Sequence, residues 1–259
     1  YATSTYEQDG PGEHKGYEYS RSANPTRKAL EVCISDLENG GSGHAFASGM
    51  AATSTIIDLL DSGDHIVACD DLYGGTFRLF ENVKKRSSDI KTDFIDFSDL
   101  NKIENAITDK TKMMIYSSPC NPSGSVYSKD ELRSLADVLV NFPVITVVSD
   151  EIYEHINFTS NYFSMGAFND MYNQVVTVNG VSKSFAMTGW RLGYIGAPEW
   201  LAKACTKIQG QFTSGTSGIS QRAAIAAISS SPSIVYEMKS AFLKRRDFVL
   251  TELNKIDGI

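Results

Sequence analysis

The chain has 259 residues, of which 31 are acidic and 24 are Lys or Arg, and its formal net charge is −7. This balance argues against nucleic acid or an anionic membrane as the main partner. No apolar run is long enough to cross a membrane and the first residues do not form a signal peptide, so we expect a cytoplasmic protein. The four cysteines and four histidines are dispersed, which predicts free thiols and no metal site.

The first 25 residues are polar and rich in Gly, Tyr and Ser, which predicts an extended arm that wraps a partner subunit. Asn24-Pro25-Thr26 then marks a helix start, and an apolar stripe at helical spacing runs from Ala29 to Leu37. Tyr19 and Arg21 lie just ahead of this helix. On the residues alone, they are as well explained as ordinary arm residues as they are as site residues.

Ser48, Gly49 and Met50 stand between a short apolar strand and a helix of small and apolar residues. A glycine lets the backbone approach a ligand closely, and the free N–H groups and dipole of a helix start favour a dianion such as phosphate. Many helices begin with Ser-Gly for capping alone, so the pattern by itself leaves that simpler interpretation open.

Strands and helices alternate in the next part of the chain. Strands are expected at residues 64–69, 91–97 and 112–116, and helices at 76–85 and 98–108. This order predicts a doubly wound α/β fold with a mostly parallel sheet. Tyr73 follows the first of these strands and precedes two glycines, so its ring either lines the rim of a crevice or packs in the core.

Two later strand ends also carry polar residues. Asn121 follows the strand at 112–116, where it is equally consistent with an ordinary turn. Asp150 and Tyr153 follow a strand expected at 144–148. A carboxylate at the end of a buried strand is costly without a cationic partner, so Asp150 indicates a bound cation or a cationic ring.

The segment Asn179–Tyr194, NGVSKSFAMTGWRLGY, follows an apolar, β-branched strand. Lys183 lies just past the carboxyl end of that strand, where open α/β sheets place their ligands, and a desolvated lysine can supply a free amine for Schiff-base chemistry. Arg191, between Gly189 and Gly193, offers a guanidinium fork suited to a phosphate. A surface lysine and a structural arginine explain the composition about equally well.

Three helices are expected around and beyond this segment. Ser128 and Glu131 form a capping box that opens one helix. Small residues predict a second helix at 220–229, and a long charged helix is expected at 233–253.

The segment around Lys183 resembles the pyridoxal 5′-phosphate (PLP) lysine signature of the class I aminotransferases, Gly-x-Ser-Lys followed by Gly-x-Arg-x-Gly. From about residue 112 onward, SSPCNPSG, SDEIYE and RRDFVLTELNKIDGI are similar to aspartate aminotransferases. The resemblance implies a Schiff base on Lys183, a contact from Asp150 to the pyridine nitrogen, and contacts from Asn121 and Tyr153 to the 3′-oxygen.

Residues 1 to about 111 resemble instead the Cys/Met-metabolism PLP enzymes, the cystathionine γ-synthase and γ-lyase group. The segments that carry this likeness are YATSTYEQDGPGEHKGYEYSRSANPT, FASGMAAT and DDLYGGTFRLF. This resemblance implies phosphate contacts from Gly49 and Met50 and ring stacking by Tyr73. It also implies that Tyr19 and Arg21 reach into the site of a neighbouring subunit.

Both families share the PLP type I fold, so we expect one large domain over residues 1–259 whose phosphate cup is Ser48–Met50 with Ser182 and Arg191. It divides into an arm (1–25), a cystathionine-synthase-like half (26–111) and an aminotransferase-like half (112–259), as in a chimera. The small C-terminal domain that grips the substrate carboxylate in both families is expected to be missing, which would weaken turnover.

The resemblances imply a PLP-dependent enzyme of amino-acid metabolism, assembled as a homodimer or a dimer of dimers. We expect transamination between an amino acid and a 2-oxo acid, with Lys183, Asp150 and Tyr73 as the catalytic residues. The alternatives are β- or γ-elimination or replacement in Cys/Met metabolism, and a catalytically silent PLP-binding fragment.

Overall fold

The computed structural model describes residues 1–39, 41–159 and 162–258. Its centre is a seven-stranded sheet with the strand order β3-β9-β8-β7-β6-β4-β5. Neighbouring strands from β8 to β5 are parallel, while β9 is antiparallel to both β8 and β3. The strands are β3 (Ser42–Phe46), β4 (His65–Cys69), β5 (Lys91–Ile95), β6 (Thr111–Ser117), β7 (Thr146–Asp150), β8 (Val175–Gly180) and β9 (Gly193–Ala197).

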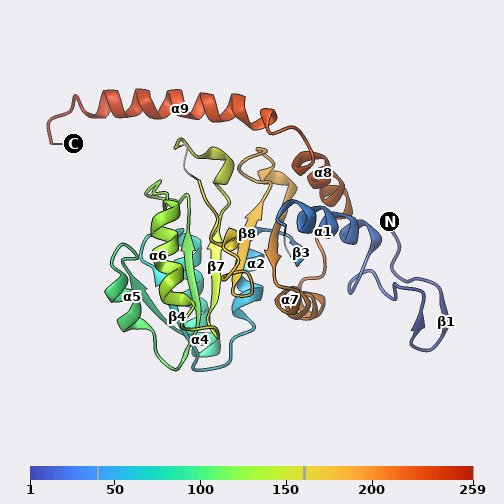
Figure 1. Ribbon diagram of the computed structural model, residues 1–259. Coiled ribbons are helices and arrows are strands. Elements are labelled where there is room, and N and C mark those ends of the chain that lie inside the picture. Colours follow the sequence, from blue (N-terminus) through green and yellow to red (C-terminus); the bar gives the residue numbers. More distant parts are fainter. Residues whose placement is uncertain (40, 160–161, 259) are drawn as a thin grey trace.

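Helices flank this sheet, as Figure 1 shows, and the predicted α/β class with a mostly parallel sheet is confirmed. They are α1 (Pro25–Leu37), α2 (Gly49–Ile57), α3 (Gly74–Arg78), α4 (Lys85–Ser88), α5 (Leu100–Ala106), α6 (Lys129–Leu139), α7 (Glu199–Phe212), α8 (Gly218–Ile228) and α9 (Ser233–Leu253). A π-helical segment, Leu79–Lys84, joins α3 to α4. Three 3₁₀ turns lie between the later elements: Glu154–Ile156, Met165–Ala167 and Thr188–Trp190.

Local sequence determines where several helices begin. The Asn24 side chain accepts a hydrogen bond from the Thr26 N–H at 2.8 Å and Pro25 occupies the first turn, so α1 begins as predicted. The predicted capping box is also present: Ser128 accepts from the Glu131 N–H at 3.2 Å, and Glu131 accepts from the Ser128 N–H at 2.7 Å. The bounds of α9 are those expected from the sequence.

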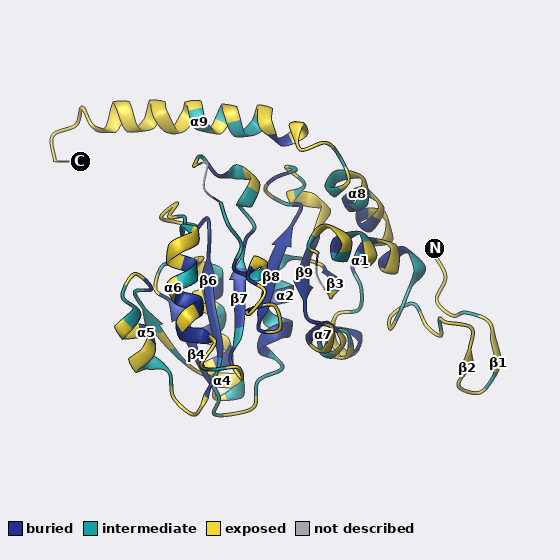
Figure 2. Ribbon diagram, viewed as in Figure 1, coloured by how far each residue is buried: buried dark blue, intermediate teal, exposed yellow. Residues whose placement is uncertain are grey.

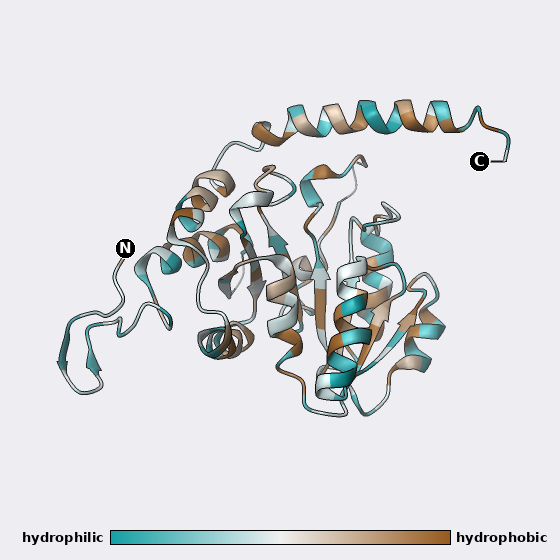
Figure 3. Cartoon of the chain, turned by 180° about the vertical axis from the view of Figure 1, so that it is seen from behind, coloured by the Kyte–Doolittle hydropathy of each residue, from teal (hydrophilic) through white to brown (hydrophobic). Residues whose placement is uncertain are grey.

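The core lies along the central strands, which Figure 2 shows as buried. Ile66, Val67, Met114, Val148 and Val176 are fully buried in it. Each such side chain stabilises the fold by roughly 1.5–3 kcal/mol relative to an exposed position. Figure 3, from the opposite side, shows the same strands as largely apolar.

The two segments that resemble different families form one continuous sheet. Strand β4, from the first segment, pairs in parallel with β6, from the second, and β3 pairs with β9. The division at residues 111 and 112 is therefore not a break in the fold.

The N-terminal segment projects from the body, and its tip is a small antiparallel pair, β1 (Gln8–Gly10) and β2 (Glu13–His14) (Figure 1). Gly12, at φ +81°, supplies the left-handed residue between the two strands. At the other end, α9 extends across the top of the molecule with most of its residues exposed (Figure 2). Among the described residues, no helix is long and apolar enough to cross a membrane.

Candidate active site

A cavity of about 260 Å³ lies at the carboxyl ends of the parallel strands. Ten predicted site residues line it together: Ser48, Gly49, Met50, Tyr73, Asn121, Asp150, Tyr153, Ser182, Lys183 and Arg191. They come from both segments that resemble different families and from six separate places in the chain. In an open parallel sheet this is where polar loop residues converge, so the topology explains the gathering.

One wall of the cavity is the start of α2. The Ser48 hydroxyl accepts the Ala51 N–H at 3.0 Å as the N-cap, which leaves the N–H groups of Gly49 and Met50 without helical partners. This end of the helix carries positive partial charge directed at the cavity. Ser48 therefore caps the helix and also lines the cavity, while phosphate binding at this helix start stays a prediction.

Close packing behind this helix start depends on Gly193. A Cβ at position 193 would lie 2.4 Å from the Gly49 backbone nitrogen and 2.5 Å from the Ser48 carbonyl carbon. Only glycine lets β9 pass at this distance. Gly193 therefore allows β9 to pack directly against the start of α2.

Arg191 reaches the cavity from a strained backbone position, with φ 54° and ψ 65°. Its guanidinium Nη1 donates to the Thr188 carbonyl at 2.8 Å, and its own carbonyl accepts the Thr216 hydroxyl at 3.0 Å. The Gln221 side chain in turn donates to the Thr216 carbonyl at 2.7 Å. These contacts hold the left-handed turn that directs Arg191.

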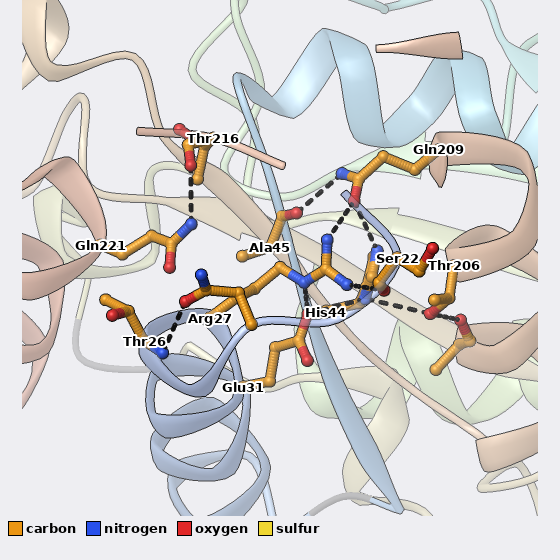
Figure 4. Close-up of polar contacts among 12 residues, drawn as sticks. Ser22, Thr26, Arg27, Glu31, His44, Ala45, Thr206, Gln209, Thr216 and Gln221 are labelled. Carbon is orange, nitrogen blue, oxygen red and sulfur yellow. Dashed lines mark hydrogen bonds and ion pairs between the residues drawn. The ribbon is translucent and has the colours of Figure 1, made fainter. Parts of the chain in front are cut away.

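Behind Thr216 lies a buried polar network between α1, β3 and α7 (Figure 4). The Arg27 guanidinium pairs with Glu31 at 3.3 Å and donates to the Gln209 amide oxygen at 3.4 Å. Gln209 also donates to the Ala45 carbonyl at 2.8 Å and its amide oxygen lies 3.1 Å from the His44 ring. The network ties α7, which precedes the loop with Thr216, to α1 and β3.

Asp150 ends β7 and faces the cavity. Burial raises the pKa of its carboxyl to about 6, although the Ile152 N–H, which donates to it at 3.3 Å, opposes this. Within the described residues Asp150 forms no ion pair. A cationic group in the cavity would offset the cost of its charge.

Lys183, Tyr153 and Asn121 form the opposite side of the cavity. The Asn121 side-chain amide donates to the Tyr153 hydroxyl at 3.3 Å, and the Lys183 ammonium lies 5.6 Å from the centre of the Tyr153 ring. Lys183 is exposed to solvent, so its amine is accessible from outside. The strand end at Asp150 and the turn at Asn121 thus border the same cavity.

Tyr73 lines the rim of the same cavity and is 45 % exposed as a residue, which excludes the interpretation as a core residue. A Cβ at position 75 would lie 2.3 Å from a Tyr73 ring carbon. The absence of a side chain at Gly75 therefore leaves room for the Tyr73 ring over the start of α3.

Tyr19 and Arg21 do not line this cavity. The Arg21 guanidinium lies 5.3 Å from the centre of the Tyr19 ring, and Arg21 borders a different hollow, next to Ser214 and Gly218. Their action in a neighbouring subunit stays a prediction.

The sequence analysis missed several lining residues, among them Thr53, Ser117, Asn179 and Thr188. Asn179 donates to Glu154 at 2.7 Å and accepts the Gly180 N–H at 2.8 Å, so it closes the strand end before Lys183. Asn179 could have been identified from the sequence, because it is the first residue of the segment that contains Lys183. The described residues contain no cluster of metal-ligating side chains, and the four cysteines are free.

Comparison with known proteins gives two kinds of relative. The family model described as Cys/Met metabolism PLP-dependent enzyme matches residues 1–156. The chain is 52% identical over 150 residues to a cystathionine beta-lyase of Coxiella burnetii, covering 58% of this chain and 38% of that protein. It is 44% identical over 161 residues to a bifunctional aspartate and glutamate/aspartate-prephenate aminotransferase of Petunia hybrida, covering 61% and 34%.

Solved structures show the same division. The aspartate aminotransferase from Rhizobium meliloti superposes with a TM-score of 0.79 and 31% identity, over 90% of this chain and 60% of that one. Cystathionine gamma-lyase from Lactobacillus plantarum superposes with a TM-score of 0.72 and 30% identity, over 87% and 57%. The chain thus spans less than two thirds of the length of each of these proteins.

Proposed function

The chain belongs to the Cys/Met-metabolism family of PLP-dependent enzymes, and from this we propose that it binds PLP in the cavity at Lys183 and transforms amino acids there. The observation that carries the proposal is the convergence of a free helix start, a half-buried carboxylate and an accessible amine in one cavity. Transamination of an amino acid with a 2-oxo acid is the reaction we favour.

The residues present fit PLP. We assign the phosphate to the Gly49 and Met50 N–H groups, Ser182 and Arg191. We assign the ring nitrogen to Asp150, because a protonated pyridine would supply the cation that this buried carboxylate needs.

The remaining assignments concern the ring and the reacting amine. Tyr73 would stack on the ring, and Asn121 and Tyr153 would contact the 3′-oxygen. When bound, PLP supplies an electron sink for the charge that develops at the substrate Cα. Lys183 would hold the cofactor covalently until the substrate amine replaces it, and its released amine would then be placed to take the Cα proton and return it. Asp150 favours the protonated ring through its negative charge.

The aminotransferase-like pair Asn121 and Tyr153 supports transamination, because the Tyr153 ring lies against Lys183, where the proton moves. A second candidate is β- or γ-elimination or replacement on cysteine- or cystathionine-type substrates. The family match and the exposed Tyr73 at the rim favour this second reaction.

The test is product analysis of the PLP-loaded protein with two substrates. Transamination predicts stoichiometric 2-oxo acid from glutamate or aspartate and no sulfide. Release of pyruvate, 2-oxobutyrate or sulfide from cysteine or cystathionine would show elimination instead. PLP binding without any product would contradict both reactions and leave a silent PLP-binding protein.

We also propose that the chain forms a homodimer through its arm, with Tyr19 and Arg21 reaching the partner site. The projection of the arm from the body supports this (Figure 1). Light scattering of the whole chain beside a chain that lacks residues 1–24 tests it, since the shorter chain should be monomeric. A dimer that persists without the arm would refute it.

A further inference from the structure

The turn that carries Asn121 lies at the surface of the protein. Residues 121–125 are mostly exposed and lie between β6 and α6. Inside the turn, the Gly124 N–H donates to the Cys120 carbonyl at 3.0 Å and the Cys120 N–H donates to the Ser125 carbonyl at 2.9 Å. These local bonds define the shape of the turn but do not place it relative to the cavity.

Asp71, which lies outside the turn, accepts hydrogen bonds from residues at both ends of it. The Ser123 and Ser125 hydroxyls both donate to the Asp71 carboxylate oxygen Oδ2, the second at 3.0 Å. The Cys120 thiol donates to the Asp71 carbonyl at 2.9 Å. Burial raises the pKa of the Cys120 thiol to about 12, so it stays protonated and able to donate.

Ser123 and Ser125 lie side by side, and both hydroxyl groups point to the Asp71 carboxylate. Their hydroxyl oxygens lie 2.8 Å apart, and the Ser125 N–H donates to the Ser123 hydroxyl at 3.0 Å. Hydrogen bonds to an ionised acceptor are about twice as strong as neutral ones, so the charge of Asp71 matters as well as its shape. Asp71 lies just beyond the end of β4 and two residues before Tyr73.

We propose that Asp71 is a positioning residue that ties the Tyr73 segment to the turn and thereby places the Asn121 amide beside the Tyr153 hydroxyl. The role rests on the proposed function, in which Asn121 and Tyr153 contact the 3′-oxygen of PLP. Asp71 does not line the cavity, so it would act through Asn121.

The first test needs no cofactor. Hydrogen exchange of the PLP-free protein should speed up about tenfold in residues 118–127 of Asp71→Ala. The matched control, Asp70→Ala, removes the same charge at an exposed neighbouring position and should leave this segment unchanged. Ser125→Ala removes one donor from the turn side and should give a smaller increase, which covers the case in which Asp71→Ala does not fold. Unchanged exchange in the Asp71 and Ser125 variants would overturn the proposal.

The second test is the pH titration of the visible band of the PLP-loaded protein. Loss of a donor to the 3′-oxygen leaves more negative charge beside the titrating proton, so Asn121→Ala should raise the midpoint by about half to one pH unit. Asp71→Ala should raise it in the same direction, and the double variant should equal Asn121→Ala alone.

Three outcomes of this titration would overturn the role of Asp71. They are additive shifts in the double variant, a midpoint in Asp71→Ala that equals the wild type, and an equal shift in Asp70→Ala. If the wild type shows no visible band, the proposed function fails and this role fails with it. In that case, faster hydrogen exchange in Asp71→Ala would still show that Asp71 holds the turn, and only the proposed PLP function would have failed.

Discussion

Replacement of Asp150 by Asn should stabilise the PLP-free protein at alkaline pH, while it should lower the activity of the PLP-loaded protein. Burial raises the pKa of the Asp150 carboxyl from its ordinary value of 3.8 to about 6, so the folded protein holds this proton more tightly than the unfolded chain. The stability that the protonated group contributes is present below about pH 4 and is lost as the pH rises through about 6. Asparagine has no charge to bury, and its amide oxygen can still accept the Ile152 N–H.

The expected size follows from the shift of the pKa. A shift of roughly 2 pH units at about 1.4 kcal/mol per unit sets an upper limit of about 3 kcal/mol at alkaline pH, and water in the open cavity reduces it to about 2. Burial raises the pKa of Glu151 to about 7 and that of Glu38 to about 8, so the wild type should lose stability over the same range for other reasons also. The difference between the two proteins isolates Asp150.

Urea unfolding of PLP-free wild type and Asp150→Asn at about pH 4 and about pH 8 measures this difference. The variant should gain about 2 kcal/mol at the higher pH and little at the lower. Asp109→Asn, at an exposed turn position, is the control and should show no such pH-dependent gain. A variant that is no more stable than wild type at about pH 8, or a gain of equal size at both values, would refute the assigned burial cost.

Three further substitutions test the packing around the site. Gly193→Ala should weaken PLP binding at least about tenfold, because its Cβ would lie 2.4 Å from the Gly49 nitrogen, and unchanged fluorescence titration by PLP would contradict this. Thr216→Val should lower stability by about 1 kcal/mol and weaken binding of inorganic phosphate, since the Arg191 carbonyl loses its donor; equal phosphate affinity would count against that support. Ile66→Ala, in the core, should cost about 2–5 kcal/mol in urea unfolding, and a loss under about 1 kcal/mol would mean that the strand is not packed as described.

Much of the fold was predictable because its signals are local. The helix starts at Pro25 and Lys129 follow from capping side chains beside them, and the parallel strands follow from apolar β-branched runs. The predicted helix at 76–85 was too short: the helical region runs from 74 to 88 and includes a π-helical segment.

Elements that depend on distant contacts were missed. Strand β9 carries two glycines in five residues, so its own preference for a strand is low and its pairing with β8 and β3 decides the conformation. Helix α7 was not predicted either. The arm was predicted as extended, but its small antiparallel pair was not, because two short strands around a Gly-Pro-Gly turn give a weak pattern.

The site was predictable to the extent that its residues follow strand ends. Topology then brings Asp150, Asn121 and Lys183 together without any further information. The contacts that hold these residues were not predictable: Asp71 meets Ser125 across 54 positions of sequence, and Thr216 meets Arg191 across 25. Such pairs depend on loop packing and carry no sequence pattern of their own.

The most direct test of the central claim is the location of covalently bound PLP. The PLP-loaded protein would be reduced with borohydride, digested and mapped by mass spectrometry, beside Lys183→Ala treated in the same way. We predict a pyridoxyl group on Lys183 and none in the variant. Absence of the group from the wild type, or attachment to another lysine that persists in the variant, would contradict the assignment of this cavity as the PLP site.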